Sequence, residues 1–175
     1  MDILILVDNK DREIGHEEKD VCHHGKPILH RAFSVFLFND KDEMLITKRS
    51  DLKKTWPGFW SNSCCSHPRK DEDLIEAAHR RVKEELGVEV KLTHIFKFQY
   101  DAMYNKEWGE NELDHVFIGK HNNVITPERD EITDWKFINI DELRRDVKIN
   151  PGKYTPWFKI CFERVIDFVN KDKNF

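Results

Sequence analysis

Runs of apolar residues separated by polar turns predict strands along most of the chain. The run over residues 32–38 is almost continuous, which is typical of a strand buried on both faces of a sheet. A polar turn at residues 39–42 follows, so the next apolar run should return as its hairpin partner. Two longer segments, after residue 90 and after residue 110, alternate with the period of two that strands show. The pattern predicts six strands, over residues 3–7, 32–38, 44–47, 90–100, 110–118 and 135–140.

A helical period replaces this pattern between residues 71 and 87. Asp71 or Asp73 can cap the start of the helix, and Gly87 can supply the left-handed residue that ends it. At about 100° per residue, one apolar stripe comprises Ile75, Val82 and Leu86. Arg81 and Glu85 lie along the edge of that stripe and should face partly inward. The residues expected to face water are Glu76, Arg80 and Lys83.

The two ends of the chain are less regular. Residues 12–27 form a polar, irregular segment that carries His16, His23 and His24. Near the other end, a short helix is expected from Asp141, and Pro156 opens a final amphipathic helix. The apolar side of that helix is predicted to comprise Trp157, Phe158, Ile160, Cys161, Val165, Ile166 and Val169.

Length and composition favour one globular domain over residues 1–175, with five Trp and twelve Phe to build its core. The net charge of −4 gives no reason to expect nucleic acid or a membrane as a partner. Four cysteines are too few for a disulfide scaffold in a chain of this length, which favours reduced thiols and a cytoplasmic protein. The apolar N-terminus is short and lacks a basic region, so it predicts a strand rather than a signal peptide. No apolar run approaches the length of a membrane span.

Three segments carry candidate chemistry. Residues 62–68, Asn-Ser-Cys-Cys-Ser-His-Pro, are expected to form a loop that holds a thiol and an imidazole beside an aromatic cluster at residues 56–60. A buried cysteine pair is an equally simple interpretation of that segment. The basic loop over residues 48–54 could receive phosphates or could simply be solvated. Glu110 and Glu112 share one face of a strand, where their repulsion requires a solvated face, a cation or a raised pKa.

The predicted helix also carries a recognisable motif. From Ser66 the chain reads Ser-x5-Glu72-x7-Arg80-Arg81-Val82-Lys83-Glu84-Glu85-Leu86-Gly87-Val88. This run resembles the Nudix box, G-x5-E-x7-R-E-U-x-E-E-x-G-U, a loop–helix–loop that places carboxylates against a magnesium ion bound to a diphosphate. Ser66 replaces the first Gly, and Arg81 replaces the first Glu of the R-E pair. The loss of that carboxylate argues against ordinary pyrophosphate hydrolysis, because it helps to build the metal cluster that activates water.

Type I isopentenyl-diphosphate isomerases show the same departure, and the chain resembles them from about Lys19 to Trp157. The resemblance is carried by residues 56–68 (Trp-Pro-Gly-Phe-Trp-Ser-Asn-Ser-Cys-Cys-Ser-His-Pro), by the Arg-Arg-x-x-x-Glu-Leu-Gly run and by Glu-Asn-Glu at residues 110–112. It implies an α/β (α+β) fold in which a mixed β-sheet is sandwiched between α-helices. It also implies the isomerisation of isopentenyl diphosphate to dimethylallyl diphosphate, by metal-assisted protonation and deprotonation through a tertiary carbocation.

The resemblance assigns roles to individual residues. Cys65 and Glu112 would be the acid–base groups, Tyr100 would lie beside Glu112, and Trp157 would cover the hydrocarbon tail. The diphosphate would be bound by Lys19, Arg49, Lys53 and Arg81. One divalent metal, Zn²⁺, Mn²⁺ or Mg²⁺, would be held by His23, His30, His67, Glu110 and Glu112, with His24 as the alternative to His23. A second ion, Mg²⁺ bridging to the diphosphate, would be held by Glu85 and the main chain near Cys65.

Two other functions compete with this one. A Nudix hydrolase of a nucleoside diphosphate derivative would share the box, but Arg81 and the histidine set argue against it. A non-catalytic module that binds a diphosphate or a metal would need neither Cys65 nor Glu112 as a proton-transfer group. The expected partner is therefore a small isoprenoid diphosphate, bound by a monomer or a weak homodimer.

Overall fold

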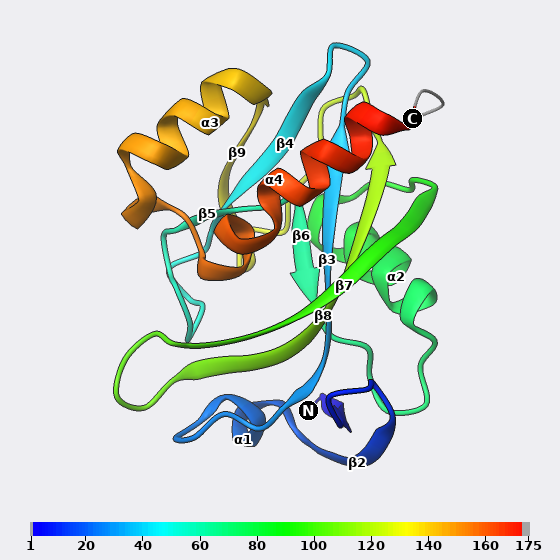
Figure 1. The fold of residues 1–175 in the computed structure, drawn as a ribbon, viewed down its shortest axis with the longest axis vertical. Helices are drawn as coiled ribbons and strands as arrows, with labels where there is room; N and C mark the ends of the chain where they lie inside the picture. Colours follow the sequence, from blue (N-terminus) through cyan, green and yellow to red (C-terminus); the bar gives the residue numbers. More distant parts are fainter. Residues whose placement is uncertain (1, 173–175) are drawn as a thin grey trace.

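The strand β3 (His30–Phe38) is the centre of a mixed sheet in the computed structural model, which describes residues 2–172 (Figure 1). It pairs parallel with β8 (Gly109–Lys120) and antiparallel with β1 (Ile3–Val7), β4 (Glu43–Arg49) and β6 (Cys64–Ser66). Almost every β3 side chain is buried, as its apolar run predicts. The sheet continues from β1 into β2 (Glu13–Glu18), from β4 into β5 (Trp60–Ser61) and β9 (Ile132–Asn139), and from β8 into β7 (Leu92–Met103).

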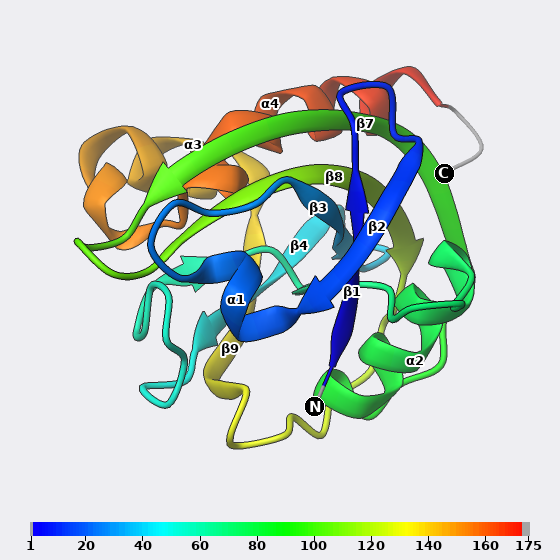
Figure 2. The ribbon, with the colours of Figure 1, turned by 90° about the horizontal axis from the view of Figure 1, so that it is seen from below.

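Two helices, α2 (Leu74–Leu86) and α4 (Pro156–Lys171), cover opposite faces of this sheet, as Figure 2 shows. Successive strand residues point to opposite faces. On β3, Phe36 therefore packs in the core under α4, whereas Val35 and Leu37 pack in the core under α2. The predicted arrangement of a mixed sheet between helices is confirmed.

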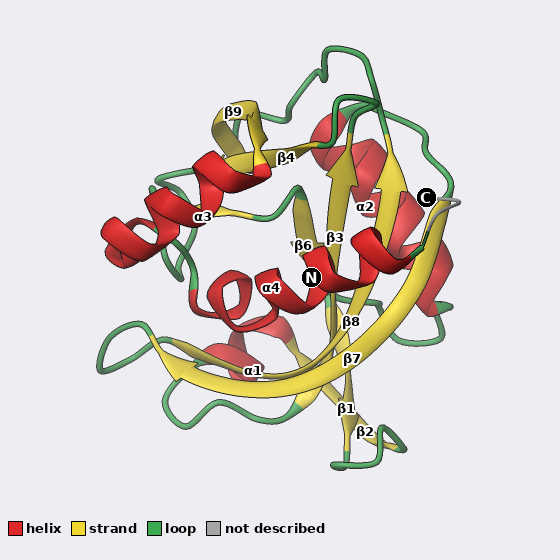
Figure 3. Cartoon of the chain, turned by 45° about the horizontal axis from the view of Figure 1, so that its top comes forward, coloured by secondary structure: helices red, strands yellow, loops and turns green. Residues whose placement is uncertain are grey.

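The remaining helices lie at the rim of the sheet. α1 (Lys19–His23) precedes β3, and α3 (Ile140–Ile149) follows β9 directly and leads into a 3-10 turn, η1 (Pro151–Lys153) (Figure 3). Leu143 anchors α3 in the core under α4. None of the helices described between residues 2 and 172 is long and apolar enough to cross a membrane.

Three expectations about local structure are wrong. Residues 12–27 are not wholly irregular, because β2 pairs with β1 and α1 follows it. β2 is an exposed edge strand, and its sequence Glu-Ile-Gly-His-Glu-Glu lacks the apolar alternation that would reveal it. Residues 64–66 form the short strand β6 rather than a loop, and β7 and β8 run further than predicted, which shortens the loop between them to residues 104–108.

The helix predictions are closer to the structure. Asp73 is the N-cap of α2, since its Oδ1 accepts hydrogen bonds from the main-chain N–H groups of the first turn, and Gly87 ends the helix in the left-handed conformation. Arg80 does not simply face water, because Glu72 pairs with its guanidinium through two hydrogen bonds of 2.6 and 2.8 Å. On α4, Ile160 is exposed, and Phe162 takes the buried position.

Gly87 gives a test of this helix end. Its φ is 70°, and a Cβ atom at this position would lie 2.9 Å from the carbonyl oxygen of Thr126. Gly87→Ala is therefore expected to lower the free energy of unfolding by about 1–3 kcal/mol. Gly152→Ala is the matched control, because nothing lies within 4 Å of its Cβ position. Urea denaturation of both variants measures the difference, and equal stability of the two would contradict the prediction.

Candidate active site

Three histidines and one glutamate converge from four separate elements. His23 ends α1, His30 opens β3, His67 follows β6, and Glu112 lies in β8. The parallel pairing of β3 with β8 places His30 directly opposite Glu112. The Nε2 atoms of His67, His30 and His23 lie 2.8, 3.4 and 3.8 Å from Glu112 Oε1. One donor atom from each residue lies within 4.8 Å of all the others, so the four can hold one metal ion.

Main-chain contacts orient two of these rings for metal binding. His23 Nδ1 lies 2.6 Å from the carbonyl oxygen of Lys19, and His30 Nδ1 lies 2.8 Å from that of Ile28. A carbonyl oxygen only accepts, so each Nδ1 carries a proton, and each Nε2 is directed toward the cluster as the metal-binding nitrogen. His30 Nε2 is buried and makes no hydrogen bond. A metal ion would satisfy this nitrogen, so the cluster fits a divalent cation.

Glu110 lies beside the cluster but is not part of the four-residue group. Its Oε1 accepts a hydrogen bond of 2.8 Å from the Thr55 hydroxyl. The Tyr100 hydroxyl lies between the two glutamates, 2.7 Å from Glu110 Oε2 and 2.6 Å from Glu112 Oε2. A phenol has one proton, so it can donate to only one of the two carboxylates at a time.

The two neighbouring carboxyl groups differ in their affinity for protons. Burial raises the pKa of Glu110, and the charge of Glu112 raises it further. Burial also favours the neutral form of Glu112, but the three histidines outweigh it and hold the Glu112 pKa well below its usual value. The repulsion expected from the sequence thus appears as a raised pKa of Glu110, while the histidine cluster stabilises the charged form of Glu112.

Cys65 and Cys64 point to opposite sides of the sheet. Cys64 is buried in the core under α2, whereas Cys65 is partly exposed and lines a cavity. Burial raises the pKa of the Cys65 thiol to about 12, although the nearby Arg49 guanidinium opposes the shift. Arg49 Nη1 lies 3.7 Å from the sulfur. Cys65 is therefore a neutral thiol that can donate a proton, while Cys64 only fills space.

The loop between β4 and β5 holds the side chain of Arg49 in the wall of the cavity. The Arg49 guanidinium donates to the carbonyl oxygens of Thr55 (2.9 Å from Nη2) and Trp56 (3.2 Å from Nε). Trp56 reaches this position with a φ of 44°, a conformation that non-glycine residues rarely adopt. The Arg49 guanidinium carbon also lies 5.2 Å from the centre of the Trp157 ring.

A cavity of about 240 Å³ joins these groups. Aromatic side chains form part of its wall: Trp157, Tyr100 and Trp108. Trp157 is held in place by Asn62, which accepts a 3.1 Å hydrogen bond from the indole N–H, and by edge contact with Trp56. The wall also carries five cations: Lys19, Arg49, Lys53, Lys54 and Arg81. The cavity can therefore hold a ligand with an anionic end and an apolar end.

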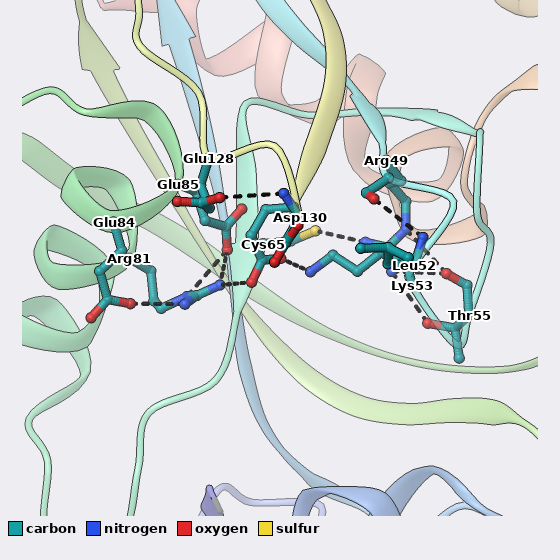
Figure 4. A network of polar contacts seen from close by, with 12 residues as sticks. Arg49, Leu52, Lys53, Thr55, Cys65, Arg81, Glu84, Glu85, Glu128 and Asp130 are labelled. Atoms are coloured by element: carbon teal, nitrogen blue, oxygen red, sulfur yellow. Dashed lines mark hydrogen bonds and ion pairs between the residues drawn. The ribbon is translucent and has the colours of Figure 1, made fainter.

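Figure 4 shows how the cations Lys53 and Arg81 are arranged near Cys65. Arg81 pairs with Glu84 (2.8 Å) and with the buried carboxylate of Glu85 (2.5 Å). It also pairs with Glu131 (2.9 Å), which in turn forms an ion pair with Lys53. Burial lowers the pKa of the Lys53 ammonium to about 8, although Glu85 opposes the shift.

The structure brings the candidate residues from the sequence together. Those that line the cavity are Lys19, His23, Arg49, Lys53, Cys65, His67, Arg81, Tyr100, Glu110, Glu112 and Trp157. His30 completes the histidine cluster, and Glu85 adjoins the cavity through Arg81. His23, and not His24, belongs to the cluster, because the His24 ring packs against Trp108 at a centroid distance of 5.2 Å.

Sequence analysis missed three residues of this region, Thr55, Trp108 and Glu131, and included Lys54 only as part of the basic loop over residues 48–54. Thr55 holds Glu110, and Trp108 and Lys54 lie at the cavity wall, with the Lys54 ammonium 4.6 Å from the Trp108 ring centre. Lys54 lies in the basic loop over residues 48–54, and the basic composition of that loop was a signal for a cation at the site. Nothing in the local sequence distinguishes Thr55, Trp108 or Glu131 from ordinary loop residues.

Comparison with known proteins identifies similar sequences over almost the whole chain. The model of the NUDIX domain family matches residues 28–158. Isopentenyl-diphosphate Delta-isomerase 1 of Aromatoleum aromaticum is 42% identical over 172 residues, covering 98% of this chain and 97% of that protein. Isopentenyl-diphosphate Delta-isomerase 1 of Bos taurus is 38% identical over 181 aligned residues, covering 91% of this chain and 80% of that protein.

Solved structures share the fold at low sequence identity. DR0079 from Deinococcus radiodurans superimposes with a TM-score of 0.69 at 18% identity, covering 85% of this chain and 90% of that one. The MutT protein from Methanosarcina mazei Go1 gives a TM-score of 0.67 at 20% identity, covering 82% and 96% of the two chains. These likenesses concern the arrangement of the sheet and helices.

Proposed function

The chain belongs to the type I isopentenyl-diphosphate Delta-isomerases, a branch of the Nudix superfamily, and we propose that it isomerises isopentenyl diphosphate to dimethylallyl diphosphate through Cys65 and Glu112. The observation that carries the assignment of these two groups is the cavity itself. A thiol, a carboxylate at the histidine cluster and an indole ring all line this one space of about 240 Å³.

The reaction requires one proton to be added and another to be removed. A new C–H bond forms at the terminal methylene carbon of the substrate, and a C–H bond breaks at the carbon next to the CH₂O group, so the double bond moves and no atom is lost. Two acid–base groups are needed, one for each carbon. Cys65 and Glu112 fill these roles, and Tyr100, hydrogen-bonded to Glu112 at 2.6 Å, positions its carboxylate.

The apolar part of the cavity protects the intermediate. A tertiary carbocation between the two proton transfers would be captured by water, so its surroundings must exclude solvent. Trp157 is buried and offers an indole face that can stabilise positive charge. Its contacts with Asn62 and Trp56 hold the ring rigidly.

The proposal includes two metal ions, and the histidine cluster fits the first of them. His23, His30, His67 and Glu112 would hold one divalent ion, with Glu110 beside them as a fifth ligand, and the mixed nitrogen and oxygen donors suit Zn²⁺, Mn²⁺ or Mg²⁺. When bound, this ion supplies positive charge that fixes the Glu112 carboxylate and makes its protonated form more acidic. Glu85 and the main chain near Cys65 would hold a Mg²⁺ that neutralises the diphosphate.

In this proposal, cations of the cavity wall bind and orient the substrate. Lys19, Arg49, Lys53 and Arg81 line the wall, so the diphosphate would bind there while the hydrocarbon end reaches Cys65 and Trp157. Fixed contacts of this kind provide orientation rather than chemistry. A Nudix hydrolase remains the second candidate only through the shared fold, because Arg81 is tied to carboxylates at the box position where such an enzyme has a glutamate.

Proton NMR of isopentenyl diphosphate in heavy water tests the proposal. The purified protein with Mg²⁺, and with Mn²⁺ or Zn²⁺ added in parallel samples, is expected to produce dimethylallyl diphosphate that carries deuterium, without release of phosphate. Deuterium enters because the donated proton exchanges with solvent. Phosphate release without an allylic product would favour the hydrolase, and an unchanged substrate with folded, metal-loaded protein would refute the assignment.

A further inference from the structure

Glu131 joins two cations that come from different elements. Its carboxylate lies 2.9 Å from Arg81 Nη2, on α2, and forms an ion pair with the Lys53 ammonium, in the loop after β4. The three side chains are only 16–23% exposed. No role for Glu131 follows from the sequence motifs, so the reason for placing an acid between these two cations has to come from the structure.

The main chain holds Glu131 firmly in this position. Its carbonyl oxygen accepts a 2.9 Å hydrogen bond from the N–H of Ser50, and its own N–H donates to the carbonyl oxygen of Glu128 at 3.1 Å. Ser50 also receives a hydrogen bond from the N–H of Lys53 at 3.2 Å. Glu131 and Lys53 are therefore both anchored through the main chain of Ser50, which places their side chains beside each other and leaves the side chains themselves free to exchange partners.

Arg81 has almost no donor left for a ligand. Its Nε and Nη2 donate to Glu85 Oε1 at 3.1 and 2.5 Å, Nη2 donates to Glu131 at 2.9 Å, and Nη1 donates to Glu84 at 2.8 Å. A guanidinium has five N–H groups, so these contacts occupy four of them. Only one N–H, on Nη1, is left, so a diphosphate that makes more than one contact with Arg81 must replace a carboxylate.

Of these carboxylates, Glu131 is the one that pairs with two cations of the cavity wall. Both Lys53 and Arg81 line the cavity, and both are paired with Glu131. One carboxylate that bridges two cations imitates the contacts that the oxygens of a diphosphate would make. It also lowers the cost of holding two positive charges close together before the anion arrives.

We propose that Glu131 is a displaceable counter-ion, which occupies Lys53 and Arg81 in the free enzyme and yields them to the substrate diphosphate. This inference rests on the proposed function, because it takes these two cations as diphosphate ligands. Glu131 would then set the affinity for the diphosphate without taking part in the proton transfers. Its removal should strengthen substrate and transition-state binding equally, which changes KM and leaves kcat unchanged.

Isothermal titration with magnesium diphosphate compares wild type, Glu131→Gln and Glu131→Ala. Both variants are expected to bind roughly tenfold more tightly than wild type, since one half-buried negative charge no longer competes with the anion. Glu128→Gln is the matched control: it removes the same charge three residues away, from an exposed side chain, and its affinity should stay within about twofold of wild type. In turnover assays, Glu131→Gln should lower KM for isopentenyl diphosphate with kcat unchanged.

Thermal melting shows whether a change in diphosphate affinity comes from a change in the stability of the fold. Without ligand, Glu131→Gln should melt no higher than wild type, and added diphosphate should raise its melting temperature by more than it raises that of wild type. Equal or weaker diphosphate binding by both Glu131 variants, with a wild type that binds, would overturn the counter-ion role and leave the isomerase assignment intact. A wild type that does not bind diphosphate would instead refute the diphosphate site of the proposed function, and the counter-ion role with it.

Discussion

Cys65→Ala is expected to lower kcat for the isomerisation by about 10²–10⁴-fold, the contribution of one positioned acid–base group. The thiol lines the cavity, and burial raises its pKa to about 12, so at neutral pH it holds its proton. Alanine removes that proton and the 3.7 Å contact of Arg49 with the sulfur, but the carbonyl oxygens of Thr55 and Trp56 still hold the guanidinium in place. The affinity for magnesium diphosphate and the circular dichroism spectrum should therefore match those of wild type.

Cys64→Ala is the matched control for this experiment. Cys64 lies next in the chain but points into the core under α2, on the other side of the sheet. Its replacement should lower the free energy of unfolding by about 1–2 kcal/mol and leave kcat within a few-fold of wild type. The NMR assay in heavy water measures the kcat of both variants. A Cys65→Ala enzyme that keeps more than a tenth of wild-type kcat would remove Cys65 from the proton-transfer pair.

The central layers of the fold could be predicted because burial imposes a clear pattern on the sequence. Apart from Ser34, residues 32–38 are apolar on both faces, since α2 packs against one side of β3 and α4 against the other. The α2 helix carries its cap, its apolar stripe and its final glycine in the sequence. The edge strand β2 could not be found in this way, because its half-exposed side chains need no apolar alternation.

The site residues that lie within recognisable motifs could be predicted. Those that act through contacts with residues distant in the sequence could not. Cys65 and Glu112 stand in recognisable segments. Thr55 and Glu131 act through partners 55 and 50 residues away, Glu110 and Arg81, and such pairings depend on the register of the sheet. The sequence shows that Glu110 and Glu112 share a face. It does not show that Thr55 holds the first while three histidines surround the second.

Glu112→Gln is expected to abolish both tight metal binding at the histidine cluster and catalytic turnover. Glu112 is the residue on which His23, His30 and His67 converge, and its carboxylate is the anionic member of the four-residue group. An amide cannot supply that charge or act as the acid–base group. The fall in kcat should be at least about 10³-fold, because the loss of the metal adds to the loss of a proton-transfer group.

Metal analysis of the purified, dialysed protein separates this effect from a general loss of structure. Wild type should retain about one equivalent of a divalent metal at the cluster under conditions in which Glu112→Gln retains almost none. Asp101→Asn is the matched control, since this exposed carboxylate lies on the neighbouring strand β7 and should change neither metal content nor kcat. Glu110→Gln should have a metal content and a kcat between those of Glu112→Gln and Asp101→Asn. Thr55 and Tyr100 hold the Glu110 carboxylate beside the cluster rather than within it. Full metal retention and turnover in Glu112→Gln would mean that the histidines alone hold the ion and that the second proton is handled elsewhere.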